Sequence, residues 1–302
     1  MRITMIGTGY VGLVSGVCFA ELGHEVSCVD TQQDKIAALS QGKIPIYEPG
    51  LDALLASNAQ AGRLHFTTQL PDAVQQADVI FIAVGTPSDA QGKADLSYVH
   101  AAAKHVAASL DGFSVIVTKS TVPVGTNRAI AGIIAEANPS ASFAVVSNPE
   151  FLREGAAIND FMEPDRIVIG VEDETAGTVM GKLYRPLTNK GYPLLRTDIE
   201  TAEMIKYASN SFLATKIAFI NEIADLCEKV DANVELVAKG MGMDERIGER
   251  FLRPGPGFGG SCFPKDAMAL SQLADDVGMD PRIVNTVIAY NLQRRETMAD
   301  KI

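Results

Sequence analysis

A glycine pattern near the N-terminus constrains the fold of this chain more than any other feature. Gly7, Gly9 and Gly12 form a GxGxxG pattern directly after the apolar run Ile3–Ile6, and a second run, Glu25–Asp30, ends in an acidic residue. A strand, a glycine turn, a helix and a strand in this register are typical of a dinucleotide-binding βαβ unit. The first glycine permits a tight turn, the second lets a pyrophosphate approach the backbone, and the third allows close helix–strand packing.

The same segment predicts the cofactor. The N-terminus of the helix after the glycines presents free N–H groups and the positive end of the helix dipole, which favour phosphate. Asp30 is placed to accept hydrogen bonds from the adenosine ribose hydroxyls, where a 2′-phosphate would meet a like charge. The sequence therefore predicts NAD rather than NADP. The alternative, in which the glycines are only turn residues and Asp30 caps a strand, does not account for all these features in register.

The rest of the chain changes texture once. Up to about residue 196, helical stretches alternate with β-branched runs, and further strands are predicted at Leu64–Thr67, Val79–Val84, Val115–Lys119, Phe143–Ser147 and Ile167–Gly170. This alternation predicts an α/β fold with a Rossmann-type, doubly wound parallel sheet. Residues 200–230 lack Gly and Pro and repeat apolar residues every three or four positions, which predicts one long helix. Shorter helices are predicted at Val234–Lys239, Asp266–Val277 and Pro281–Lys301.

These patterns predict two domains, and composition narrows the partners. We expect an NAD-binding domain over residues 1–196 and an all-helical central domain over residues 197–302. Acidic residues number 37 against 26 basic ones, a net charge of −11, which argues against nucleic acid or an anionic membrane as partner. The chain has no signal-peptide pattern and no apolar run long enough to span a bilayer, so we expect a soluble, cytoplasmic protein. The four cysteines lack the spacing of a metal site or a disulfide framework.

One cysteine differs from the other three. Cys262 ends the glycine-rich loop Arg253–Pro264, and Lys265 and Asp266 follow it closely. A nearby ammonium, or a helix beginning near Pro264, would favour the nucleophilic thiolate. Beside a nicotinamide cofactor, such a thiolate could attack an aldehyde formed from an alcohol, pass through a thiohemiacetal and a thioester, and release a carboxylate. The cysteines expected to be buried apolar residues are Cys18, Cys28 and Cys227.

Seven motifs, spread in order through the chain, together resemble the UDP-glucose 6-dehydrogenase family, within the wider group that oxidises nucleotide sugars to uronic acids. They are GTGYVG at 7–12, YEPGL at 47–51, AVGTP at 83–87, KSTVPVGT at 119–126, NPEFLREG at 148–155, AEMIKYASNSFLATKIAFINE at 202–222 and GFGGSCFPKD at 257–266. The combination is far more specific than any one motif.

The resemblance implies a set of catalytic residues. Lys206 and Asn210 lie four apart on the long helix, share a face, and resemble the pair that stabilises a developing oxyanion. A solvated helix lysine is the alternative for Lys206. The resemblance implies that Cys262 is the nucleophile and that Asp266 is an acid group assisting the cysteine and its attacking water. It implies that Thr121 and Glu154 are a pair that holds the catalytic water and moves protons. Glu150 is implied to be a supporting acid.

The resemblance also implies binding residues. Those similar to NAD-binding positions, besides the three glycines and Asp30, are Tyr10, Val11, Lys35, Thr86, Thr121, Glu154 and Lys265. Those similar to substrate-binding positions are Phe151, Leu152, Arg153, Lys206, Asn210, Arg246, Phe258 and Gly259. Two alternatives stay open: Glu154 could pair with Arg153 or a helix end, and Arg246 could belong to a solvated charge run, Asp244 to Arg250.

The implied reaction is the NAD-dependent, four-electron oxidation of UDP-glucose at C6 to UDP-glucuronate. GDP-mannose and UDP-N-acetylmannosamine are alternative substrates, because their dehydrogenases share most of the motifs. Arg246 resembles an arginine that reaches the substrate, within one chain or across a dimer interface, and a homodimer through the long helix is expected. Family members continue into a UDP-binding domain that this sequence lacks, so an NAD-binding dimerisation module without turnover remains an alternative. A β-hydroxyacid dehydrogenase is a further alternative, but it offers no use for Cys262.

Overall fold

The computed structural model describes residues 1–89 and 92–301. The chain divides into two compact units. The sheet unit comprises Met1–Pro87 and Asp95–Lys206, and the helical unit comprises the described residues of Ser88–Ala94 and Tyr207–Ile302. The division falls inside helix α10 (Ile199–Val230). The proposed domain boundary at residues 196 and 197 lies just before this helix, at the end of strand β8 (Leu194–Thr197).

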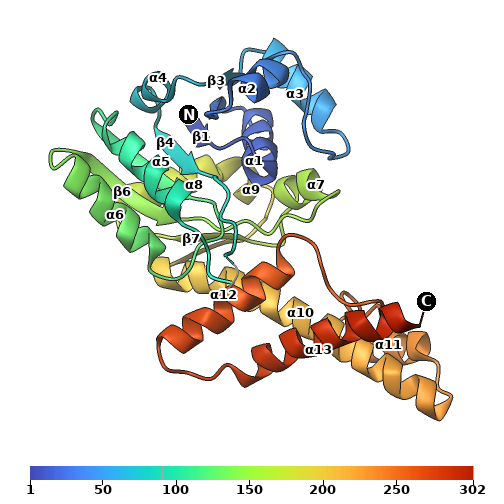
Figure 1. Cartoon of the computed structure of the whole chain (residues 1–302). Helices are drawn as coiled ribbons and strands as arrows, with labels where there is room; N and C mark the ends of the chain where they lie inside the picture. Colours follow the sequence, from blue (N-terminus) through green and yellow to red (C-terminus); the bar gives the residue numbers. More distant parts are fainter. Residues whose placement is uncertain (90–91, 302) are drawn as a thin grey trace. The chain divides into compact units, whose positions relative to one another are not determined.

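The sheet unit is built on one eight-stranded sheet with the order β3-β2-β1-β4-β5-β6-β7-β8 (Figure 1). Neighbouring strands are parallel except β6 and β7, which are antiparallel through the pair Ser147 and Gly170. The bounds of the first seven strands are β1 Arg2–Ile6, β2 Glu25–Val29, β3 Leu64–Thr67, β4 Val79–Ile82, β5 Phe113–Thr118, β6 Ser142–Ser147 and β7 Ile167–Gly170.

The seven strands predicted from the sequence are all confirmed, with ends shifted by at most two residues. Two features were missed. The Rossmann-type, doubly wound parallel sheet is confirmed, but the antiparallel pairing of β7 with β6 was not foreseen. Strand β8 was not predicted because it lies at the sheet edge, where its residues Leu195 and Arg196 are exposed and no continuous apolar run is needed.

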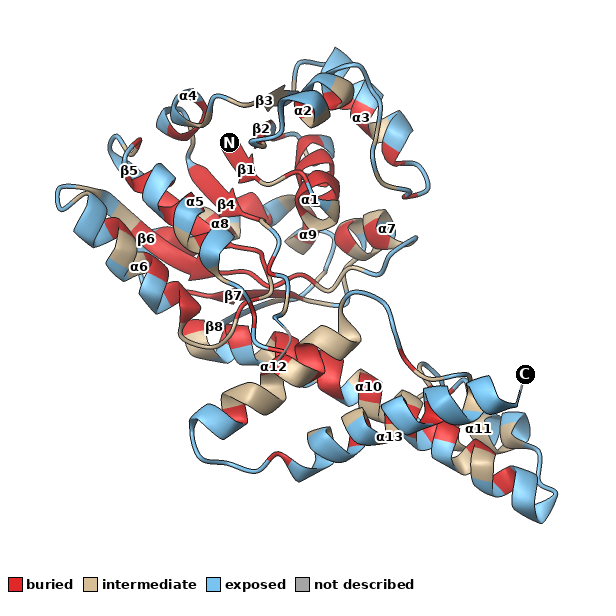
Figure 2. Cartoon of the chain, viewed as in Figure 1, coloured by how far each residue is buried: buried red, intermediate tan, exposed pale blue. Residues whose placement is uncertain are grey.

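Helices cover both faces of the sheet and bury two apolar cores. Strand β4 shows the alternation, since Phe81 packs into one core while Ile80 and Ile82 pack into the other. Figure 2 shows β4 as buried. The first core is completed by α1 (Tyr10–Glu21), α2 (Gln33–Ser40), α3 (Leu51–Gln60), α7 (Ala157–Met162), α8 (Glu174–Leu183) and α9 (Arg185–Thr188). The second is completed by α4 (Leu70–Gln75), α5 (Ser97–Ala107) and α6 (Thr126–Ala137).

The strand order reverses between β1 and β4, which are neighbours although β2 and β3 separate them in sequence. In doubly wound sheets, ligands bind at the carboxyl ends of the strands beside such a reversal. Three quoted motifs begin at or just after the carboxyl ends of β1, β4 and β5, and a fourth follows β6. The topology therefore gathers four of the predicted functional segments along one edge of the sheet.

The helical unit contains most of α10 together with α11 (Val234–Gly242), α12 (Phe263–Asp276) and α13 (Arg282–Asp300). Phe258 is the largest side chain of its small apolar core, with Ala214, Ala218 and Val287. The long helix is confirmed. Helix α12 begins three residues earlier than predicted, because a proline such as Pro264 is tolerated in a first turn. Among the described residues, no helix is long and apolar enough to cross a membrane.

Candidate active site

The glycine turn after β1 has the geometry that its sequence predicts. Gly7 has φ +97°, and a Cβ there would lie 2.6 Å from the carbonyl oxygen of Ala83. A Cβ on Gly12 would lie 2.0 Å from the carbonyl oxygen of Gly7. Both positions are therefore reserved for glycine by the packing of the protein itself. A Cβ on Gly9 would meet nothing within 4 Å, so that side of the turn is open to a ligand.

Helix α1 begins at Tyr10 with its first N–H groups available. Its cap residue, Gly9, has no side chain to bond them, and the first turn carries no acidic residue. The first turn of an α-helix lacks intrahelical partners for its N–H groups and carries the positive end of the dipole. The backbone of Tyr10, Val11 and Gly12 thus fits the phosphates of a dinucleotide.

Asp30 follows β2 and is held in place by hydrogen bonds. Its Oδ2 accepts from the backbone N–H (3.0 Å) and hydroxyl (2.7 Å) of Thr8 and from Lys35 Nζ (2.8 Å). Burial raises the pKa of this carboxyl, but the bonds from Lys35 and Thr8 outweigh it and lower the pKa to about 2. Oδ1 accepts only from the N–H of Gln32 (3.1 Å) among the described groups, which leaves capacity for a ribose hydroxyl. This carboxylate fits the unphosphorylated ribose of NAD.

Two predicted cofactor residues, Thr86 and Thr121, are in contact with each other. The hydroxyl of Thr86, after β4, donates to the backbone carbonyl of Thr121, after β5, at 2.9 Å. Ser120 ties the same two loops together, since its hydroxyl donates to the carbonyl of Val84 at 2.7 Å. The structure therefore brings the AVGTP and KSTVPVGT motifs into contact.

Glu150 and Lys206 form a buried ion pair. Lys206 Nζ donates to Glu150 Oε1 at 2.8 Å and to the Glu150 carbonyl at 2.7 Å, and the two residues are only 4% and 6% exposed. Burial raises the pKa of Glu150, but the charge and hydrogen bond of Lys206 outweigh it and the net pKa is lowered. The alternative of a solvated helix lysine is wrong. The ammonium also lies 5.4 Å from the ring centroid of Phe151.

The predicted sugar loop is folded back on itself. The backbone N–H of Leu152 donates to Glu150 Oε2 at 2.6 Å. The backbone N–H of Arg153 donates to Asp160 Oδ2 at 2.8 Å, and its guanidinium forms an ion pair with the same carboxylate. Asp160 is thus a partner of Arg153. Glu154 is exposed on the same loop.

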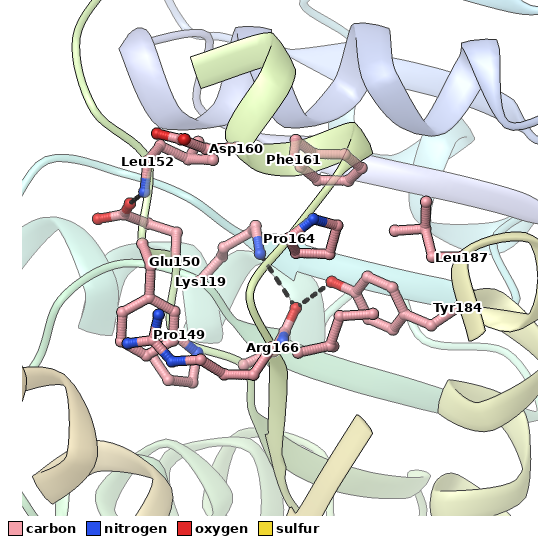
Figure 3. A pocket seen from close by; sticks show the side chains of 13 residues that line it. Lys119, Pro149, Glu150, Leu152, Asp160, Phe161, Pro164, Arg166, Tyr184 and Leu187 are labelled. Carbon is pink, nitrogen blue, oxygen red and sulfur yellow. Dashed lines mark hydrogen bonds between the residues drawn. The ribbon is translucent and has the colours of Figure 1, made fainter. Parts of the chain in front are cut away.

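Glu150 also lines a small cavity of about 40 Å³, which has enough room for water. Figure 3 shows Lys119 and Tyr184 converging in it. Lys119 Nζ (3.1 Å) and the Tyr184 hydroxyl (2.5 Å) both donate to Asn148 Oδ1. Burial lowers the pKa of Lys119 to about 8. We did not predict a role for Lys119 or Asn148, although both belong to quoted motifs.

In the helical unit, Cys262 occupies the N-cap position of α12 and is partly exposed. Its carbonyl accepts from the N–H of Asp266 at 2.8 Å. The Asp266 side chain is fully buried, accepts from Asn210 Nδ2 at 2.6 Å, and lies 3.0 Å from Lys265 Nζ. The structure therefore brings three predicted residues together one helical turn from the predicted nucleophile.

The other cysteines are buried, as expected. Burial raises the pKa of both Cys18 and Cys28 to about 12. At neutral pH these two are thiols with no access to a substrate. Among the described residues, no three His, Cys, Asp or Glu side chains gather as a possible metal site.

Three predicted substrate residues have different surroundings. The Phe258 ring is 5% exposed and lies edge-on to Phe263 at 6.4 Å, and its backbone N–H donates to Asn291 at 2.7 Å. Its backbone carbonyl accepts from Asn291 Nδ2 at 3.0 Å, so both backbone polar groups of Phe258 are bonded within the helical unit. Gly259 is exposed. Arg246 is exposed and forms an ion pair with Asp244 at 2.6 Å, which is the arrangement of the solvated charge run considered above.

Two buried carboxylates were missed. Glu203, on α10, accepts from the N–H groups of Gly125 (2.7 Å) and Asn127 (3.0 Å) and so fixes the start of α6. Glu48, in the YEPGL motif, is buried among backbone amides. Apolar periodicity carries no signal for either residue, although both lie in quoted motifs.

Both parts of the chain match described sequence families. Residues 1–188 match the UDP-glucose/GDP-mannose dehydrogenase family, NAD binding domain, and residues 200–293 match the central domain of the same family. A UDP-glucose 6-dehydrogenase of Rhizobium meliloti (strain 1021) is 61% identical over 305 residues, which cover 100% of this chain and 70% of the relative.

Solved structures agree. A UDP-glucose dehydrogenase from Pyrobaculum islandicum superposes with a TM-score of 0.93 at 42% identity, covering 98% of this chain and 68% of that one. A GDP-mannose dehydrogenase from Pseudomonas aeruginosa has a TM-score of 0.79 at 38% identity, covering 97% and 69%. The chain thus spans roughly two thirds of the length of these proteins.

Proposed function

Because the chain belongs to the UDP-glucose/GDP-mannose dehydrogenase family, we propose that this NAD-dependent oxidoreductase converts UDP-glucose to UDP-glucuronate. The choice of sugar is supported by 61% identity to a relative named UDP-glucose 6-dehydrogenase, against 38% to the GDP-mannose dehydrogenase. The observation that carries the mechanism is the partly exposed Cys262 one helical turn from the buried Asp266.

The cofactor residues have separate tasks. The N–H groups at the start of α1 hold the phosphates, and Asp30 Oδ1 accepts from a ribose hydroxyl. We assign Thr86, Thr121, Glu154, Lys35 and Lys265 to the surroundings of the same cofactor. When bound, NAD supplies a hydride acceptor.

In the proposed reaction, loss of a hydride from C6 and of a proton from its hydroxyl leaves an aldehyde. The Cys262 thiolate attacks the aldehyde carbon, and protonation of the resulting alkoxide gives a thiohemiacetal. Loss of a second hydride and the hydroxyl proton gives a thioester, and water cleaves its C–S bond to release the carboxylate and regenerate the thiol. Four electrons leave one carbon, so two NAD are reduced for each UDP-glucose.

We assign Lys206 and Asn210 to the stabilisation of the oxyanions of these steps. The Lys206 ammonium uses two hydrogens on Glu150 and has a third to donate. The Asn210 amide uses one hydrogen on Asp266 and has a second. Because each donor is oriented by a buried carboxylate, little reorganisation is needed when negative charge develops. Thr121 and Glu154 would hold the water and move its proton, and Phe151, Leu152, Arg153, Arg246, Phe258 and Gly259 would contact the substrate.

The purified protein is tested with NAD and a panel of UDP-glucose, GDP-mannose and UDP-N-acetylmannosamine, with NADH and uronate measured. We expect two NADH per UDP-glucose. Cys262→Ser keeps the shape but not the nucleophilicity, so turnover should fall by about 1000-fold or more while NAD still binds. Cys227→Ser, at a buried cysteine outside the proposed site, is the control. Uronate formation by Cys262→Ser at the normal rate would contradict the thioester mechanism. NAD binding without turnover of any of the three sugar nucleotides would favour the alternative of an NAD-binding dimerisation module.

We also propose a homodimer formed through α10. Phe212, Phe219 and Leu226 are 65%, 46% and 56% exposed and lie seven residues apart, so they form one apolar stripe on the helix. A second copy of the chain would cover this stripe. We propose that the dimer is cytoplasmic. Light scattering should give twice the chain mass, and Phe219→Asp should halve it. A wild-type monomer would contradict the proposal.

A further inference from the structure

Glu48 is a buried carboxylate with no part in the steps above. It lies in the loop before α3 and is 6% exposed. Its Oε1 accepts from the backbone N–H of Ala157 at 2.9 Å, and its Oε2 accepts from the N–H of Gly155 at 2.9 Å. These bonds satisfy one donor at the end of the NPEFLREG motif and one at the first residue of α7.

The same carboxylate also holds the phosphate-binding helix. The hydroxyl of Tyr10, the first residue of α1, donates to Glu48 Oε2, and the N–H of Gly155 lies 3.1 Å from that hydroxyl. Burial and the hydrogen bond to Glu48 raise the pKa of Tyr10 well above its usual value, so the phenol keeps its proton to donate. Tyr10, Glu48 and Gly155 therefore form a closed triangle of polar contacts.

The loop that Glu48 holds carries two of the proposed catalytic groups. The ion pair between Glu150 and Lys206 holds the beginning of this loop. The hydrogen bonds from the N–H groups of Gly155 and Ala157 to Glu48 hold its end. Glu154 directly precedes Gly155 in the chain, and its negative charge also raises the pKa of the Tyr10 hydroxyl. The phosphate turn and the loop of Glu154 thus share one carboxylate anchor.

We propose that Glu48 is a positioning residue that couples NAD binding at the first turn of α1, through the Tyr10 hydroxyl, to the order of residues 148–157. The inference deepens the proposed function and rests on it for the role of the loop. Phosphate bound by the backbone of Tyr10 restrains that residue, its hydroxyl restrains the Glu48 carboxylate, and the carboxylate restrains the amides of Gly155 and Ala157. Cofactor binding thereby prepares the loop that carries Glu150 and Glu154.

The coupling is tested by hydrogen exchange of the backbone amides in residues 148–157, with and without saturating NAD. In the wild type we expect NAD to slow exchange at Gly155 and Ala157 by about tenfold. Tyr10→Phe removes only the hydroxyl, and Glu48→Gln turns one acceptor into a donor that faces an N–H. In both variants the slowing by NAD should shrink to less than about threefold. Tyr47→Phe removes a hydroxyl from an 86% exposed neighbour and should behave as wild type.

The NAD-dependent difference separates coupling from simple support of the loop. A purely structural role would speed exchange equally with and without NAD and leave the difference intact. Tyr10→Phe should have no further effect in a Glu48→Gln background, since both break one chain of contacts. Equal slowing by NAD in wild type and in Tyr10→Phe, or no slowing in the wild type, would overturn the inference. Because the measurement uses NAD alone, absence of UDP-glucose turnover would refute the proposed function without touching this result.

Discussion

The side-chain amide of Asn210 donates to the buried carboxylate of Asp266 at 2.6 Å, which joins α10 to the first turn of α12 directly after Cys262. Removing this donor leaves a fully buried carboxylate with fewer partners. Asn210→Ala should therefore lower the free energy of unfolding by about 1–3 kcal/mol, measured by urea denaturation. Gln293→Ala, at an exposed position of α13, should change it by less than about 0.5 kcal/mol. Equal stabilities for Asn210→Ala and wild type would mean that the contact contributes nothing.

Gly9 and Gly12 belong to one motif but should fail differently. A Cβ at Gly12 collides with the Gly7 carbonyl, so Gly12→Ala should destabilise the protein by about 2 kcal/mol or more. A Cβ at Gly9 meets nothing, and its φ of −70° suits alanine, so Gly9→Ala should leave the melting temperature unchanged. The same methyl group would stand where the pyrophosphate approaches, and the Kd for NAD should rise at least about tenfold. Calorimetry of both variants checks this, and tight NAD binding by Gly9→Ala would contradict the assigned phosphate path.

Asp30 should set the choice between NAD and NADP. Asp30→Ser removes a carboxylate that is ionised at neutral pH and would bond the ribose. Since a hydrogen bond to a charged group contributes about 1.5–3 kcal/mol, the Kd for NAD should rise about 10- to 100-fold, and the discrimination against NADP should shrink. Asp34→Ser makes the same change of charge at an exposed position and should alter neither value. Unchanged discrimination in Asp30→Ser would assign the preference to another group.

Lys119 should make stability depend on pH. Burial lowers its pKa from 10.5 to about 8, so between these values the unfolded chain binds the proton and the folded protein does not. Stability therefore rises with pH in this window, and below pH 8 the full cost of about 3 kcal/mol is present. Lys119→Met should be more stable than wild type at pH 7, and its advantage should shrink towards pH 10.5. Lys104→Met, on the exposed face of α5, should show no such pH dependence, and an advantage of Lys119→Met that is constant with pH would contradict the assignment.

Periodicity in the sequence predicted the buried strands and the long helix but missed the exposed edge strand β8. Strands such as β4 are buried on both faces and must be apolar throughout, so they stand out as continuous runs. Helix α10 stands out because 32 residues pass without a glycine or proline. Strand β8 lies at the sheet edge with exposed side chains, and its pairing with β7 is a tertiary choice that local pattern does not encode.

The site was predicted unevenly for a related reason. The glycine turn and Asp30 are local features, so spacing alone located them. Lys206 and Glu150 are 56 residues apart, and their pairing depends on the fold; only the family resemblance indicated that both matter. Glu48 and Lys119 were missed because charged residues read as solvated by default, whereas here both are buried and held by polar groups from distant segments.

The space beside Gly9 is open, whereas Gly12 is crowded. Substitutions at these two positions should therefore have different effects on the amount and the activity of the protein in a living cell. Changes at Gly12 act on folding, so their harm would appear as lower protein abundance after degradation. Changes at Gly9 leave folding alone, so their harm would appear as full abundance with lost catalysis. A library scored for both quantities would therefore separate two neighbouring glycines into different classes of defect and locate the cofactor without a bound ligand.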